Sequence, residues 1–284
     1  MAATDALAMT YGLCSALSWG ASDFSGGYAT RGAGVITVAF LSQTVGAIFL
    51  LALVLLLGAP MAAAGSLLFG AMAGLCGAMG LMGLYTGLSK GRMGVIAPTS
   101  AVLAALLPTL FAMLTQGLPA ASTLLGFPLA MAAVWLLSSS GGMTKRQLSS
   151  SRELLMALLA GAGFGLFFIC IDAAGGEGFL WTLLCARGAS ISMFGLVLLT
   201  RGGIRAQSQR QMVLIAICGL LDTTGNALFA MAAHLGRLDI AAVLCSLYPG
   251  VTIMLACLLL KERLSLRQWG GVGAALGAIV LIAS

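Results

Sequence analysis

Long apolar stretches, separated by short polar segments, constrain the fold of this chain more than any other feature. Residues 249–260 carry no charge and residues 272–284 carry none either, yet the segment KERLSLR between them, residues 261–267, contains four charges. A membrane-spanning helix needs roughly 20 apolar residues to cross the hydrocarbon core of a bilayer. The pattern therefore predicts a helical membrane protein in which charged loops join apolar spans.

The composition supports this interpretation, because 60% of the 284 residues are hydrophobic and only 8% are charged, whereas soluble domains contain about 25% charged residues. We predict an all-α integral membrane protein with ten transmembrane helices. The expected spans end at charges, glycines and prolines. They cover residues 8–28, 34–57, 65–88, 94–115, 121–138, 153–172, 178–200, 211–234, 239–260 and 266–283.

The N-terminus and the cysteines carry no targeting or metal-binding signal. The first residues, MAATDALAMTYG, lack the basic n-region of a signal peptide, so we expect the first apolar run to remain as a span. All seven cysteines fall within expected spans and none forms a CxxC pair, a distribution that predicts neither a disulfide framework nor a zinc site. We therefore expect no metal and no other cofactor.

An internal repeat relates the two halves of the chain. An ungapped offset of 145 residues aligns small and apolar positions throughout, and it pairs Gly20 with Gly165, Gly74-Leu75 with Gly219-Leu220, Gly80 with Gly225, and Gly91-Arg92 with Gly236-Arg237. The longest hydrophilic segment lies at the midpoint. We therefore expect a first five-helix repeat at 1–140, a cytoplasmic linker at 141–152 and a second five-helix repeat at 153–284.

Five spans in each half place the two repeats in opposite membrane orientations, the inverted arrangement of many transporters. Alternate loops contain twelve of the fourteen Lys and Arg residues, the loops of the other face contain only Arg237, and Arg187 lies within a span. Positively charged loops remain in the cytoplasm. The twelve charges therefore mark the cytoplasmic face, and we expect both termini on the opposite side.

The charged segment KERL differs between the repeats for the same reason. At the 145-residue offset it aligns with QGLP, residues 116–119, which carries no charge. One copy faces the cytoplasm and the other does not, so only one can keep basic residues. We expect a local salt bridge of Glu262 with Lys261 or Arg263, and a capping box between Ser265 and Gln268 at the start of the tenth span.

The segment from Ser246 to the C-terminus resembles the closing segment of the EamA family in the drug/metabolite transporter superfamily. Its landmarks are Pro249, Glu262-Arg263-Leu264, Gln268 and the pair Gly270-Gly271. Near the start, ALSWGASDFSGG resembles the family's first span, where a Trp-Gly pair precedes a small polar run. Gly117 departs from the pattern, because the first repeat would be expected to carry a glutamate there.

The resemblance implies a multi-pass carrier of a bacterial inner membrane with a central cavity between its halves. Many members export amino acids and other metabolites, and exporters of aromatic amino acids of the YddG type are the narrowest match. The implied partners are a small-molecule substrate and the lipid bilayer. An uptake carrier and a drug efflux pump are the alternatives. Direction, coupling ion and oligomeric state stay open, and a monomer is compatible with the sequence.

Two charged residues lie deep within expected spans, where ionisable side chains are costly and usually face the bundle interior. At a rise of 1.5 Å per residue, Arg187 lies about 13 Å and Asp222 about 18 Å below the outer ends of their helices, a difference that an arginine side chain can bridge. They form either a structural ion pair or a site for the charged ends of a zwitterion or for a coupling proton. Asp23 is either a cavity carboxylate or a partner of Arg31.

Aromatic and amide side chains within the spans complete the expected site. An aromatic ring can stack on an apolar part of a substrate, whereas Ser and Thr can satisfy their hydroxyl groups on their own helix more easily than Gln and Asn satisfy their amides. The expected substrate-binding residues are Trp19, Asp23, Gln43, Tyr85, Phe164, Trp181, Arg187, Asp222, Asn226 and Tyr248.

Catalysis and nucleic-acid binding are not expected. A serine protease within the membrane would need Ser190 and His234 in contact, yet the expected depths place His234 at the end of one span and Ser190 near the middle of another. The net charge of +6 comes from loops that follow the membrane topology and not from a basic groove. We therefore predict neither an enzyme nor a nucleic-acid partner.

Overall fold

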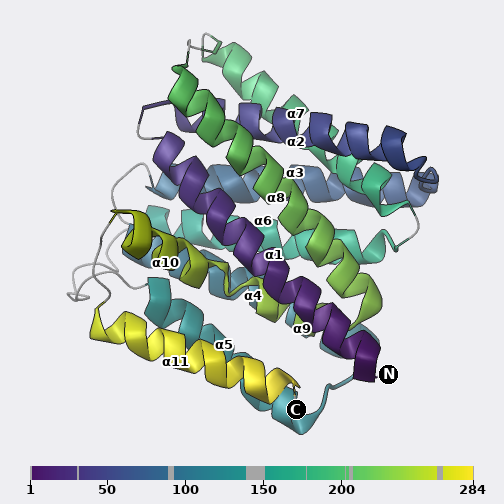
Figure 1. Cartoon of the computed structure of the whole chain (residues 1–284), viewed down its shortest axis with the longest axis vertical. Helices are drawn as coiled ribbons and strands as arrows, with labels where there is room; N and C mark the ends of the chain where they lie inside the picture. The colour runs from purple at the N-terminus through teal and green to yellow at the C-terminus, as the bar shows by residue number, and fades with distance from the viewer. Residues whose placement is uncertain are drawn as a thin grey trace.

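The chain folds into a bundle of helices (Figure 1). The computed structural model describes residues 2–30, 32–88, 93–138, 151–176, 178–201, 203–204, 207–260 and 265–283, and these residues contain helices and no strand. The helices are α1 (Ala2–Ala29), α2 (Val35–Leu57), α3 (Ala64–Leu88), α4 (Met93–Gln116), α5 (Ala121–Ser138), α6 (Ser151–Ala173), α7 (Phe179–Thr200), α8 (Gln209–Leu235), α9 (Leu238–Cys245), α10 (Tyr248–Leu260) and α11 (Leu266–Ala283).

Each of the ten predicted spans coincides with a helix, except that the range 239–260 contains two, α9 and α10. Pro249 lies in the first turn of α10, where its missing N–H has no helical partner to lose. Within the described residues, six segments are long and apolar enough to cross a membrane, and three more helices are apolar but shorter. The six are Val35–Leu57, Ala64–Leu84, Leu155–Ala173, Phe179–Thr200, Gln209–Leu235 and Leu238–Leu259. The prediction of an all-helical membrane protein is confirmed, and the count of ten spans stays a prediction.

The predicted capping box at the start of α11 is present. The backbone N–H of Gln268 donates to Ser265 Oγ at 3.3 Å, and the backbone N–H of Ser265 donates to Gln268 Oε1 at 2.9 Å. Residues 141–150 of the predicted linker and the segment KERL lie outside the described residues. The salt bridge predicted for Glu262 lies there too.

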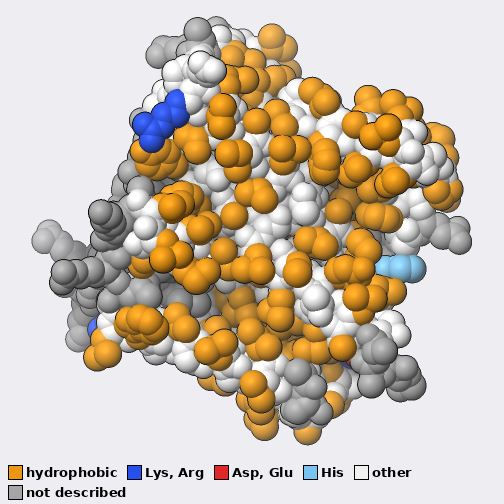
Figure 2. All heavy atoms as spheres, in the orientation of Figure 1, with side chains coloured by type: hydrophobic (Ala, Val, Ile, Leu, Met, Phe, Trp, Pro, Cys, Tyr) orange, Lys and Arg blue, Asp and Glu red, His pale blue; other side chains and the backbone are white. Residues whose placement is uncertain are grey.

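The outer surface of the bundle is apolar. Figure 2 shows hydrophobic side chains over most of the visible face and few charged ones among them. Large side chains such as Leu56, Leu114 and Leu266 are more than four-fifths exposed. A soluble protein rarely exposes a continuous apolar surface of this kind, so the surface is suited to contact with lipid.

The helices of the two halves pack in a repeated pattern. Helix α1 packs along α8, and its counterpart α6 packs along α3, while α2 contacts α8 as α7 contacts α3. A Cβ atom on Gly225 would lie 2.5 Å from Trp19 Cδ1, and one on Gly80 would lie 2.9 Å from Phe164 Cδ1. The two contacts are related by the 145-residue offset, because Gly80 aligns with Gly225 and Trp19 aligns with Phe164. Equivalent residues thus make equivalent contacts in the two halves.

One loop contact ties the end of α4 to the start of α9. Arg237 donates to the carbonyl oxygens of Gln116 at 3.3 Å and Gly117 at 2.5 Å, and it forms an ion pair with Asp239 at 2.8 Å. Gly117 has a φ of +79°, a conformation that favours glycine. A glutamate at this position would strain the backbone, so glycine suits the turn that follows α4.

Candidate functional site

A cavity lies between the helices in the middle of the bundle, and both halves of the chain line it. Helices α1, α2, α3 and α4 contribute from one half, and α6, α7, α8 and the break between α9 and α10 contribute from the other. Its volume is about 120 Å³, whereas a single water molecule needs roughly 10–15 Å³ of such space. The cavity therefore has room for more than one water molecule.

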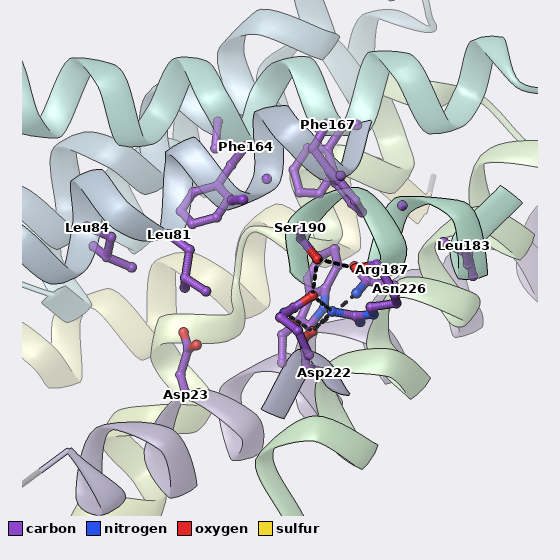
Figure 3. A pocket seen from close by; sticks show the side chains of 18 of the residues that line it. Asp23, Leu81, Leu84, Phe164, Phe167, Leu183, Arg187, Ser190, Asp222 and Asn226 are labelled. Atoms are coloured by element: carbon purple, nitrogen blue, oxygen red, sulfur yellow. Dashed lines mark hydrogen bonds and ion pairs between the residues drawn. The ribbon is translucent and has the colours of Figure 1, made fainter. Parts of the chain in front are cut away.

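An ion pair between Arg187 of α7 and Asp222 of α8 lies on the cavity wall (Figure 3). Arg187 Nη1 lies 2.6 Å from Asp222 Oδ2, and it also donates to Oε1 of Gln43 on α2. The arginine side chain is only 7% exposed, whereas the aspartate is 28% exposed. Asp222 is therefore the member of the pair that is open to the cavity.

Neighbouring polar side chains hold this pair in place. Gln43 Nε2 and Asn226 Nδ2 each donate to Asp222 Oδ2 at 3.4 Å, and Ser190 Oγ donates to Gln43 Oε1 at 2.9 Å. Asn226 follows Asp222 by one helical turn and Ser190 follows Arg187 in the same way, so each helix presents two polar side chains on one face. Together these five residues form the polar cluster of the cavity.

One donor of the polar cluster has no acceptor. Arg187 Nη2 is buried and makes no hydrogen bond within the described residues. A buried donor without a partner costs about 1–3 kcal/mol, and more when it is charged. An acceptor that came within hydrogen-bond reach of this nitrogen, such as a carboxylate, would relieve this cost.

Aromatic rings form another wall of the cavity. Trp19 of α1 stacks on Phe168 of α6 with a centroid distance of 5.5 Å, and Phe168 contacts Phe229 at 4.5 Å. Phe164 and Phe167 line the same side. Phe164 and Phe168 are four residues apart and share a helix face. The cavity therefore offers ring faces to an apolar group beside a charged cluster.

Asp23 lines the cavity apart from the polar cluster. It lies on α1, one turn beyond Trp19, and Figure 3 shows it below Leu81, away from the dashed bonds that join Arg187, Ser190 and Asp222. No hydrogen bond or ion pair reaches its carboxylate from the described part of the chain. Arg31, the alternative partner, lies outside the described residues.

The structure brings most of the predicted site residues together. Those that line the cavity are Trp19, Asp23, Gln43, Phe164, Arg187, Asp222, Asn226 and Tyr248. Trp181 does not line it, because its indole N–H donates to the carbonyl oxygen of Ala59 at 3.1 Å, beside the end of α2. The side chain of Tyr85 lies outside the described residues. Binding of a substrate by any of these residues stays a prediction.

Several lining residues are ones that the sequence did not single out. They include Leu81, Phe168, Phe194 and Ser246. The spacing of four residues from Phe164 could have indicated Phe168, whereas an isolated phenylalanine such as Phe194 gives no such signal.

Ser190 and His234 occupy different places in the fold. Ser190 lines the central cavity and donates to Gln43. His234 lies in the last turn of α8 and lines a separate pocket together with Asp172 and Gly175. The arrangement that a serine protease needs is not formed by this pair.

The chain is similar to a curated protein in part of its sequence and to a solved structure in its fold. An uncharacterized protein of Methanocaldococcus jannaschii is 28% identical over 120 residues, which are 42% of this chain and 86% of that protein. A protein crystal structure aligns with a TM-score of 0.78 at 14% identity and covers 96% of this chain and 97% of its own. At that identity the likeness shows a shared fold alone.

The second half of the chain is similar to a known protein family. Residues 151–284 match the EamA-like transporter family, and they contribute Arg187, Asp222 and Asn226 to the cavity. Residues 151–284 are therefore similar to the EamA-like transporter family over nearly half of the chain.

Proposed function

We propose that this protein is a carrier that exports a small metabolite across a bacterial inner membrane. The substrate is an amino acid, most narrowly one with an aromatic side chain. Ten spans in two inverted five-helix halves expose the central cavity to each side of the membrane in turn. The choice of export over uptake rests on the resemblance to a family rich in exporters.

One observation carries this proposal: the cavity joins a charge pair to an aromatic wall. Arg187 Nη2 is a buried donor that has no acceptor among the described residues and would gain one from a carboxylate, and Asp222 is the part-exposed carboxylate that can accept from an ammonium group. The rings of Trp19, Phe164 and Phe167 lie in the same cavity. An amino acid with an aromatic side chain presents all three complementary groups.

The repeated packing supports alternating access. The contact of Gly225 with Trp19 has its counterpart in that of Gly80 with Phe164, so the interfaces α1–α8 and α6–α3 are built alike. Because the two interfaces flank one cavity and are similar, each can adopt the conformation of the other. In inverted-repeat transporters, this exchange opens the central site first to one side of the membrane and then to the other.

Transport of radiolabelled amino acids into vesicles that contain the purified protein tests the proposal. We expect saturable flux of phenylalanine, tyrosine and tryptophan above that of empty vesicles, and little flux of aspartate, because its second carboxylate has no cationic partner among the described lining residues. In Phe164→Leu, phenylalanine flux should fall by roughly two- to twelvefold, the equivalent of about 0.5–1.5 kcal/mol of lost ring contact.

The matched control is Phe111→Leu, since Phe111 lies on the exposed surface of α4 and does not line the cavity. It should leave the flux unchanged. Flux of cationic drugs in place of amino acids would instead support a drug efflux pump, and concentration of amino acids from the outer side alone would support an uptake carrier. Flux at the rate of empty vesicles across the whole panel would contradict the proposal.

A further inference from the structure

We infer that Asp23 is the proton-binding carboxylate that couples this transporter to the proton gradient, and that it exchanges one proton for each substrate molecule bound at Arg187 and Asp222. The inference rests on the proposed function, since it names the coupling ion of the same cavity. It assigns different tasks to the two cavity carboxylates, one to the substrate and the other to the proton.

The first step is the contrast between the two aspartates. Asp222 accepts from Arg187, Gln43 and Asn226. Asp23 lines the same cavity, yet no hydrogen bond or ion pair reaches it from any described residue. Figure 3 shows it below Leu81 and separate from the polar cluster. The two carboxylates therefore lie in different electrostatic surroundings.

The second step is the charge balance of the cavity. Among the described lining residues Arg187 is the one cation, and it is paired with Asp222. An ionised Asp23 would therefore add one uncompensated negative charge among apolar groups, which is costly within a membrane. A cation has to offset it, and the smallest that fits is a proton on the carboxyl group itself.

A metal cation fits less well. Hard cations such as Ca²⁺ take about 6–8 oxygen ligands, and no group of three or more His, Cys, Asp or Glu side chains that could hold a metal occurs in the described part of the chain. A proton needs only the one carboxyl group that is present.

The groups that face Asp23 come from the helices packed against α1. Helix α8 presents Asp222 and the thiol of Cys218, and α10 presents the phenol of Tyr248. Helix α2 contributes the neutral Gln43 to the cavity, and Asp239 of α9 is paired with Arg237 at the end of that helix. Asp222 is thus the one strongly acidic neighbour, and the two carboxylates repel each other.

This repulsion links the substrate to the proton. When the ammonium group of an amino acid binds at Asp222, it offsets the repulsion that Asp222 exerts on Asp23 and makes the ionised form of Asp23 less costly, so the proton leaves. By reciprocity, a proton on Asp23 weakens binding of the substrate. The proton departs to the side from which the substrate comes and is replaced from the other side after the substrate is released. One proton therefore enters for each substrate that leaves.

Vesicles that contain wild-type protein, Asp23→Asn or Asp5→Asn test this inference with L-phenylalanine as the probe. With the membrane potential clamped, a pH difference of about one unit should drive roughly tenfold accumulation in the wild type, as one-to-one exchange requires. Asp23→Asn should show no accumulation above equilibrium, while its exchange of labelled for unlabelled phenylalanine continues. Asp5→Asn is the matched control, because Asp5 lies exposed on the same helix, and it should accumulate phenylalanine like the wild type.

A second measurement does not depend on the substrate. The infrared carbonyl stretch of a protonated carboxyl group should be present at neutral pH in the wild type and in Asp5→Asn, and absent in Asp23→Asn. Asp23→Glu keeps a carboxyl group, so it should retain gradient-driven accumulation and shift the infrared band. This variant decides the inference even if Asp23→Asn fails to fold.

Accumulation in Asp23→Asn equal to that of the wild type would overturn the inference, and so would an infrared band that this change leaves in place. A wild type that moves no phenylalanine contradicts the proposed function instead, and the infrared band then decides by itself whether Asp23 carries a proton.

Discussion

Arg187 and Asp222 depend on each other, because the arginine is almost fully buried and the aspartate is its one acidic partner. Arg187→Met leaves an unpaired carboxylate in the cavity, and we expect it to lower the free energy of unfolding by roughly 3 kcal/mol or more. The double variant Arg187→Met with Asp222→Leu removes both charges, so its unfolding temperature in detergent should recover. Flux of phenylalanine should not recover, since both groups that we propose to bind the zwitterion are gone.

The comparison pair for this experiment is Arg237 with Asp239, an ion pair of 2.8 Å that does not line the cavity. Replacing these two residues by Met and Leu should leave the affinity for phenylalanine unchanged. Asp222→Asn should fold and lose flux. Wild-type flux in the double variant of Arg187 and Asp222 would show that their pair is structural alone.

The charged and amide members of the site could be predicted from the sequence, whereas only some of its apolar members, such as Trp19 and Phe164, could. A charge or amide within a span is so costly in lipid that it has to face the interior, which is why Gln43, Arg187, Asp222 and Asn226 all line the cavity. Phe194 carries no such cost and is equally stable against lipid. Trp181 was misplaced because a backbone carbonyl near the helix end satisfies its indole N–H as well as a cavity would.

At the scale of helices, two glycines related by the repeat set the distance between neighbours. A Cβ atom on Gly74 of α3 would lie 2.0 Å from the carbonyl oxygen of Ala186 on α7, and one on Gly219 of α8 would lie 2.3 Å from that of Ser42 on α2. These atoms belong to the backbone, so the helices must separate to admit a methyl group. Gly74→Ala and Gly219→Ala should each destabilise the protein by about 1–3 kcal/mol, measured as a lower unfolding temperature in detergent.

Gly188→Ala is the control for these two variants. Gly188 lies in the middle of α7, and no atom would lie within 4 Å of a Cβ added there. Its unfolding temperature should stay the same or rise slightly, since alanine favours a helix over glycine by up to about 1 kcal/mol. If Gly74→Ala and Gly219→Ala behaved like Gly188→Ala, the close crossings would not limit stability.

The positions of the helices could be predicted well, because hydropathy decides which residues are stable in lipid. The break between α9 and α10 was not predicted as a break. Its residues Ser246 and Tyr248 line the cavity, and Pro249 indicated only a kink. A span interrupted at the depth of a cavity keeps the same hydropathy as a continuous one, so only the tertiary contacts reveal it.

At the scale of the whole molecule, the one basic residue that the charge pattern places on the outer face is neutralised by its contacts. Arg237 pairs with Asp239, which is fully buried, and it donates to two carbonyl oxygens at the end of α4. Its charge therefore does not oppose the orientation that the twelve other basic residues predict. The start of α1 and the end of α11 also lie at the same end of the bundle (Figure 1).

This distribution of charge leads to a prediction about topology. Since moving Lys and Arg across the membrane is costly, the basic loops stay in the cytoplasm and the two termini lie in the periplasm. Alkaline phosphatase fused after Ser284 should be active, and a fluorescent protein at the same position should be dark. A fusion after Arg201, at the end of α7, is the internal control and should give the opposite pair of signals. An inactive phosphatase and a bright fluorescent protein after Ser284 would show that the protein has the opposite orientation. The cavity carboxylates would then lie in the opposite order relative to the proton gradient.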